Sequence, residues 1–171
     1  MTKAAAAWTV VPSTPKDIEL IRKKCRRLVM RRAAISAGVS AVPIPGLDIV
    51  SDLSLLATLI EDINTEFGLT PAQIDRLQPK RRIAAYEMIV SMGSVMVGKV
   101  VTKALIGRLL QRTGMKILVK HSARLVPLAG QVVAAGIGFA TFRAIGNQHI
   151  EACTSVAAEL MTVASEPARG G

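Results

Sequence analysis

Apolar side chains recur every three to four positions through the middle of the chain, and this spacing constrains the fold most. One such stripe places apolar residues on a single face of a helix for almost three heptads: Ile49, Leu53, Leu56, Ile60, Ile63 and Phe67. Gly68 follows the stripe, and a glycine just past a helix commonly ends it. No window alternates apolar and polar residues in the manner of a half-buried strand. The pattern therefore predicts an all-α protein without a sheet.

Local start signals predict where further helices begin. Thr14-Pro15-Lys16-Asp17 supplies a hydroxyl cap, a proline for the first helical position and an acid three residues after the cap. Thr70-Pro71-Ala72-Gln73 repeats this arrangement and predicts a short helix that ends before Pro79. From Arg81 to about Arg124 the chain is helical in character, and we divide this stretch near Gly98 and Gly114.

These signals predict one all-α domain over residues 14–164, a bundle of five to seven helices. Two long apolar helices, at 47–67 and 128–163, would form its centre. Residues 1–13 and 165–171 are expected to be flexible tails.

Two similar turns are predicted to reverse the chain. Val42-Pro43-Ile44-Pro45-Gly46 must interrupt a helix, because a proline disfavours helical backbone at the residue before it. Val126-Pro127-Leu128-Ala129-Gly130 has the same order of apolar residue, proline and glycine. Each follows a basic segment and precedes an apolar one. The structural residues of these turns are predicted to be Pro43, Pro45, Gly46, Pro127 and Gly130.

Positive charge is concentrated in two segments of this 171-residue chain of net charge +10. Residues 16–32 hold eight basic and two acidic side chains, and residues 80–124 hold ten basic and one acidic. Such concentration can form a face that binds an anionic partner. The residues predicted to bind an anionic surface are Arg22, Lys23, Arg26, Arg27, Arg31, Arg32, Lys99, Lys103, Arg108 and Arg112.

Residues that could support catalysis or metal binding are sparse. Cys25 and Cys153 are too far apart in sequence to suggest a metal motif, and they predict free thiols in a reducing compartment. His121 and His149 show no metal-ligand spacing and are expected at the surface or at a helix cap. Asp48, which follows the Pro-Gly turn, is expected to cap a helix. We predict no catalytic, metal or cofactor site.

Hydropathy leaves two membrane arrangements open. Residues 125–142 carry no charge over eighteen positions, the lower limit for a spanning helix, whereas the apolar stretch 33–60 is interrupted by Asp48 and Asp52. Both stretches are compatible with buried helices of a bundle or with membrane-embedded hairpins. The small residues Gly136 and Gly138, with their alanine neighbours, are expected to allow close helix approach in either medium.

The run Ala41-Val-Pro-Ile-Pro-Gly-Leu-Asp-Ile-Val50, continued to Phe67-Gly68-Leu69, resembles a known family. It is similar to the helical domain of the immunity-related, interferon-inducible GTPases, and to membrane-associated helical domains attached to bacterial GTPases. The resemblance covers about residues 33–150. A GTPase needs a phosphate-binding loop, and Gly93-Ser-Val-Met-Val-Gly98-Lys99-Val100 lacks the hydroxyl that binds magnesium. The resemblance therefore implies a stand-alone helical module without the GTPase portion and without catalysis.

These observations predict a non-enzymatic, membrane-associated helical module. Its basic helices would bind anionic lipid, and its location would be cytoplasmic, peripheral to or embedded in the membrane. The alternative is a soluble interaction module that docks a GTPase or another protein partner, and homo-oligomerisation fits either prediction. Nucleic-acid binding is a distant third, because single-strand binders use aromatic stacking platforms and only 3% of these residues are aromatic.

Overall fold

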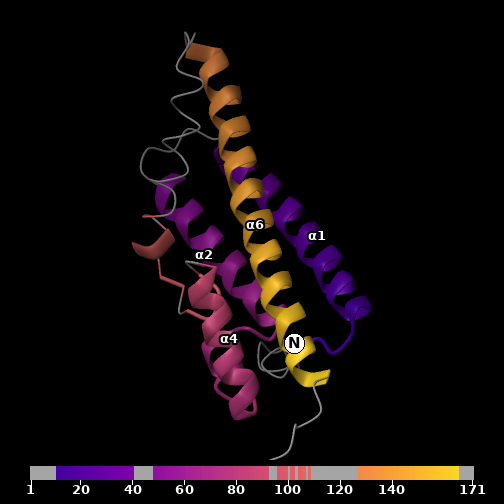
Figure 1. The fold of residues 1–171 in the computed structure, drawn as a ribbon. Helices are drawn as coiled ribbons and strands as arrows, with labels where there is room; N and C mark the ends of the chain where they lie inside the picture. The colour runs from indigo at the N-terminus through magenta and orange to yellow at the C-terminus, as the bar shows by residue number, and fades with distance from the viewer. Residues whose placement is uncertain are drawn as a thin grey trace, which may run out of the picture. The chain divides into compact units, whose positions relative to one another are not determined.

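The computed structural model describes residues 11–40, 48–92, 96–99, 101–102, 104–106, 108 and 127–165. Over these residues the protein is all-α and has no strand, which confirms the predicted fold class (Figure 1). The described helices are α1 (Pro15–Ser40), α2 (Asp48–Glu66), α3 (Pro71–Ile74), α4 (Pro79–Ser91) and α6 (Pro127–Ser165).

The predicted cap of α1 is present. The backbone amide of Asp17 donates to Thr14 Oγ1 at 3.1 Å, and the Thr14 hydroxyl donates to Asp17 Oδ2 at 2.7 Å. One backbone donor of the first turn is thereby satisfied, and the carboxylate lies at the positive end of the helix. The sequence signal and the structure agree at this helix start.

Helix α2 ends at the predicted glycine in a Schellman motif. Gly68 has a φ of 71°, and its amide donates to Thr65 O at 3.1 Å while that of Leu69 donates to Asn64 O at 2.8 Å. Both bonds satisfy carbonyls that the helix end leaves unpaired. Immediately afterwards, Thr70 and Gln73 form the predicted capping box at the start of α3. Helix α3 is a single turn.

The predicted division of the long helical stretch near Gly98 coincides with a turn, although the helix before this turn ends several residues earlier than predicted. Helix α4 begins at Pro79 and already ends at Ser91, and residues 97–98 form a turn. Gly98 has a φ of 67°, and a Cβ there would lie 2.7 Å from Ile89 Cδ1. Glycine is therefore required at this turn for both its backbone and its lack of a side chain. Gly114 lies outside the described residues.

The turn predicted at Pro127–Gly130 is instead the first turn of α6. Proline is well suited to this position, because its missing N–H is one that a helix start leaves unpaired anyway. Its fixed φ is already helical, so the residue that was read as a reversal opens the helix. The companion turn at Pro43, Pro45 and Gly46 lies outside the described residues.

The chain divides into two compact units, each assembled from separated segments. Unit 1 comprises Met1–Arg26, Ile60–Val100 and Gln148–Gly171, and unit 2 comprises Arg27–Leu59 and Val101–Asn147. Helices α1, α2 and α6 each contribute residues to both units. The described residues of unit 1 bury an apolar core that includes Ile63, Phe67, Leu69, Ile74, Ile89, Ile150 and Leu160. Those of unit 2 bury Val29, Ala33, Leu56, Leu59, Ile106, Phe142 and Ile145.

Close helix packing in unit 2 depends on a different glycine from those predicted. Among the described residues, a Cβ on Gly136 or Gly138 would meet no atom within 4 Å, and both glycines are exposed, so no described helix approaches them closely. A Cβ on Gly146 would lie 2.7 Å from Val29 Cγ2 and 3.4 Å from Leu59 Cδ2. Gly146 therefore lets α6 pack tightly against α1 and α2.

Candidate functional site

The basic residues at the start of α1 are held by acids within unit 1. Arg22 forms a two-point contact with Glu151 of α6, with Nε 3.1 Å from Oε1 and Nη2 2.6 Å from Oε2. Arg26 Nη2 donates to the same carboxylate at 3.0 Å. These hydrogen bonds, first that from Arg22, hold the pKa of Glu151 below its usual range. The charges of Arg22, Arg26 and Glu151 therefore help to hold α1 against α6 within unit 1.

The neighbouring lysines are also paired. Lys24 Nζ lies 2.7 Å from Glu66 Oε2 of α2, and Lys23 Nζ lies 3.9 Å from Glu19 Oε1 one turn earlier in α1. Of the ten residues predicted to bind an anionic surface, Arg22, Lys23 and Arg26 thus have acidic partners already. An external anion would compete with these carboxylates for them.

The basic residues of α1 in unit 2 have a different environment. Arg27 and Arg31 are exposed, and neither takes part in any ion pair given for the described residues. Two exposed apolar side chains flank these arginines around the helix, with Met30 44% and Ile35 47% accessible. Positive charge and apolar surface are therefore interleaved on one side of the helix. We call Arg27, Met30, Arg31 and Ile35 the α1 face.

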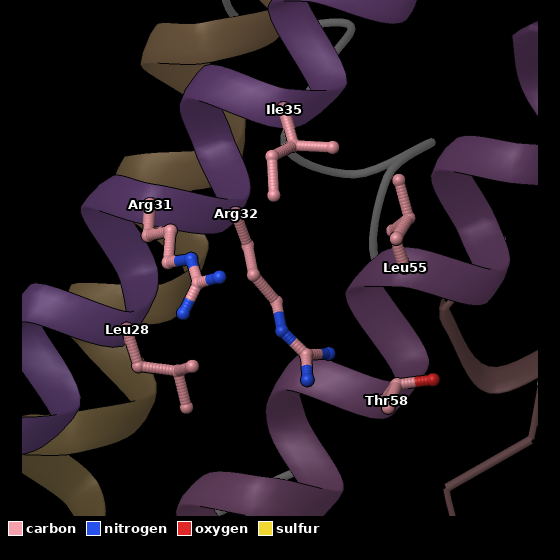
Figure 2. A pocket seen from close by; sticks show the side chains of 6 residues that line it. All are labelled: Leu28, Arg31, Arg32, Ile35, Leu55 and Thr58. Carbon is pink, nitrogen blue, oxygen red and sulfur yellow. The ribbon is translucent and has the colours of Figure 1, made fainter.

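The α1 face borders an open hollow between α1 and α2 within unit 2. The hollow has a volume of about 440 Å³ and is lined by Leu28, Arg31, Arg32, Ile35, Leu55 and Thr58. Figure 2 shows both arginine side chains extending from α1 over this space, with Arg32 directed toward α2. Leucine and isoleucine side chains form the apolar part of its lining. The hollow thus offers guanidinium groups beside an apolar surface, which suits an amphiphilic anion.

The remaining predicted residues are dispersed. Lys99, in unit 1, and Arg108, in unit 2, are exposed. Lys103 and Arg112 lie outside the described residues, as does His121. The side chains of Asp48 and Asp52 are likewise outside the described part, so the expected helix cap by Asp48 stays a prediction. The described candidate site is therefore the α1 face with its hollow.

A buried polar cluster in unit 1 was missed by the sequence analysis. His149, expected at the surface or at a cap, is buried, and its Nε2 lies 2.9 Å from Asn64 Oδ1. Asn64 Nδ2 donates to the carbonyl of Met96 at 3.1 Å, and Cys153 Sγ lies 3.6 Å from both His149 Nε2 and Asn64 Oδ1. One asparagine thus joins α2, α6 and the turn after α4.

A sequence signal for this burial was available. His149 continues the spacing of Phe142, Ile145 and Cys153 along α6, all of which are buried. A histidine in register with an apolar stripe belongs to the core face rather than to the surface. The helical register therefore indicated the burial, although it could not identify Asn64 as the hydrogen-bond partner.

The buried cluster lacks the electrostatics of a reactive thiol site. Burial raises the pKa of the Cys153 thiol well above its ordinary value and lowers the pKa of His149 to about 4. Burial likewise raises the pKa of Cys25 to about 12. A nucleophilic cysteine requires the thiolate, which these surroundings disfavour. The cluster serves as a set of hydrogen bonds inside the core of unit 1.

The described residues contain neither a metal-binding group of side chains nor a helix that could span a membrane. No group of three or more histidine, cysteine, aspartate or glutamate side chains among them is arranged to hold a metal ion. None of the described helices combines the length and the hydropathy that crossing a bilayer requires.

Comparison with known proteins yields no relative. No family model matches the chain, and neither a curated protein nor a solved structure is significantly similar to it.

Proposed function

We propose that this protein is a non-enzymatic helical module that binds anionic lipid surfaces peripherally, on the cytoplasmic side, through the α1 face. The observation that carries the proposal is the difference between the two halves of α1. In unit 1, Arg22, Lys23, Lys24 and Arg26 are paired with Glu19, Glu66 and Glu151, whereas in unit 2 Arg27 and Arg31 are exposed beside accessible apolar side chains.

This arrangement suits the boundary between lipid headgroups and acyl chains. Guanidinium groups bind phosphate oxygens by two-point hydrogen bonds, and Met30 and Ile35 can enter the apolar edge of the bilayer. Each basic residue near an anionic membrane contributes about 1 kcal/mol. The hollow beside Arg31 and Arg32 provides further apolar surface next to the charges.

Vesicle flotation with a double charge reversal tests the proposal. The full chain should float with vesicles that contain phosphatidylserine and should stay behind with pure phosphatidylcholine. Replacement R27E/R31E should lower the bound fraction by about tenfold or more, because two attractive contacts become repulsive. Both residues are exposed, so the fold should be retained, which circular dichroism would verify.

A matched variant controls for net charge. K16E/K80E also replaces two exposed cations and lowers the formal charge from +10 by four, to +6. If the α1 face carries the binding, this control should float nearly as well as the original chain. Equal loss in both variants would show that only total charge matters, and unaltered flotation of R27E/R31E would refute the proposed site.

A further inference from the structure

Helix α4 exposes an apolar stripe beside the face that it buries in the core of unit 1. Ala85 and Ile89 are buried, whereas Val90 is 77% accessible, Ile83 57% and Tyr86 39%. The three exposed residues are spaced by three and four positions, so they lie on one helix face. This stripe is separate from the α1 face, which belongs to unit 2.

The stripe has the spacing of a helix-pairing surface. If Ile83 and Val90 are assigned to successive a positions of a heptad, Tyr86 falls at the intervening d position. The Tyr86 hydroxyl donates to Asp75 Oδ1 at 2.9 Å, so this side chain is held before any partner arrives. A side chain that is already ordered loses less conformational entropy on association.

The charges beside the stripe specify the partner. In this register, Arg82 occupies the g position that directly precedes Ile83, Glu87 occupies the e position five residues later, and both are exposed. In a parallel helix pair, a g residue meets the e residue five positions later on the other helix. Two copies of α4 side by side would thus bring each Arg82 against the other copy's Glu87. In an antiparallel pair, g meets g and e meets e, so these opposite charges would not meet.

We propose that α4 mediates self-association of this protein, as a parallel pair formed with the α4 of a second copy. The same patch is used on both copies, as two-fold symmetry requires. The helix has 13 residues, fewer than two full heptads, so the interface is small and the dimer is weak and concentration-dependent. This inference is independent of the proposed lipid binding.

Sedimentation equilibrium of the full chain over a wide concentration range tests the association. We expect a monomer–dimer equilibrium, and V90E should abolish it by placing charge in the stripe. R82E alone and E87R alone should each weaken dimerisation about tenfold, because the symmetric interface contains the pair twice. The charge exchange R82E/E87R should restore the affinity of the original chain.

The charge exchange is decisive because both positions are exposed and the net charge of the chain is unchanged. A monomer at all concentrations would overturn the proposal and would leave the stripe to a bilayer or to a different protein. Dimers that survive V90E would place the interface elsewhere. A double variant no better than the single ones would refute the parallel arrangement. Circular dichroism of each variant establishes that the fold is intact.

Discussion

At the scale of single residues, Asn64 connects three buried groups in the core of unit 1. It accepts from or donates to groups of His149, Cys153 and Met96, all of them buried. A buried polar group is costly unless it is hydrogen-bonded, and then its partners depend on it in turn. This dependence makes the cluster sensitive to the protonation state of its one histidine.

The free energy of unfolding should depend on pH in the mildly acidic range because of His149. The pKa of His149 is about 4 in the folded protein because burial disfavours its charged form, and the ordinary value is 6.5. Between these values the unfolded chain binds the proton and the folded chain does not. The free energy of unfolding is therefore highest above pH 6.5. It should decrease by about 3 kcal/mol in total as the pH falls from 6.5 to about 4.

Urea unfolding followed at several pH values between 7 and 4.5 would measure this loss. H149Q keeps a side-chain amide that can donate to Asn64 and removes the titration, so its free energy of unfolding should vary less with pH over this range. The pKa of Glu151 is held below its usual value by Arg22, so its contribution falls mostly at lower pH. Equal slopes for H149Q and the original chain would contradict the assignment.

At the scale of helices, Gly146 and Gly138 form a natural pair for comparison, because both lie in the part of α6 that belongs to unit 2. The Cβ of G146A would lie 2.7 Å from a methyl carbon of Val29, which is fully buried and cannot move away easily. We expect G146A to lower the free energy of unfolding by about 1–3 kcal/mol. G138A meets no atom and should stabilise the helix by up to about 1 kcal/mol.

Thermal unfolding of the two variants side by side measures this difference. Each replacement adds one methyl group to the same helix, so a shared effect on helix propensity cancels. The midpoint should fall for G146A and rise slightly for G138A. A similar rise in both would mean that α6 does not approach α1 and α2 as closely as described.

The same comparison shows which features of the elements can be predicted from sequence. Helix ends depend on neighbouring residues, so Thr14, Gly68 and Thr70 were sufficient to predict an N-cap, a helix end and a second N-terminal cap. Which glycine permits close packing depends on residues far away in the chain. Gly146 is tight because of Val29 and Leu59, and no local pattern distinguishes it from Gly138.

The candidate site shows the same division between local and distant information. The sequence predicted a basic α1, and its helical spacing was sufficient for that. It could not predict that Glu151, which is 129 positions from Arg22, would take two of the cations. Because distant acids pair with several cations of α1, the candidate binding site on this helix is centred on the exposed Arg27 and Arg31.

At the scale of the whole molecule, net charge predicts how lipid binding responds to salt. The chain carries +10 overall, and exposed charges are screened over about 10 Å at 0.1 M salt and about 3 Å at 1 M. Binding to phosphatidylserine vesicles should therefore decrease steeply between these concentrations. Flotation across a salt series measures this decrease, and retention at 1 M salt would show that apolar insertion outweighs charge.

The interleaved segments of the two units also decide how the protein can be dissected. Unit 1 requires residues on both sides of 27–59 and of 101–147, and unit 2 is interrupted by residues 60–100, so no uninterrupted stretch of chain consists of one unit alone. A protease that cuts once cannot release one unit from the other, and a truncation that removes residues after 147 takes His149 and Glu151 with it. Independent fragments would have to be designed by joining segments through new linkers, because trimming both ends removes parts of unit 1 and still leaves its segment 60–100 between the two segments of unit 2.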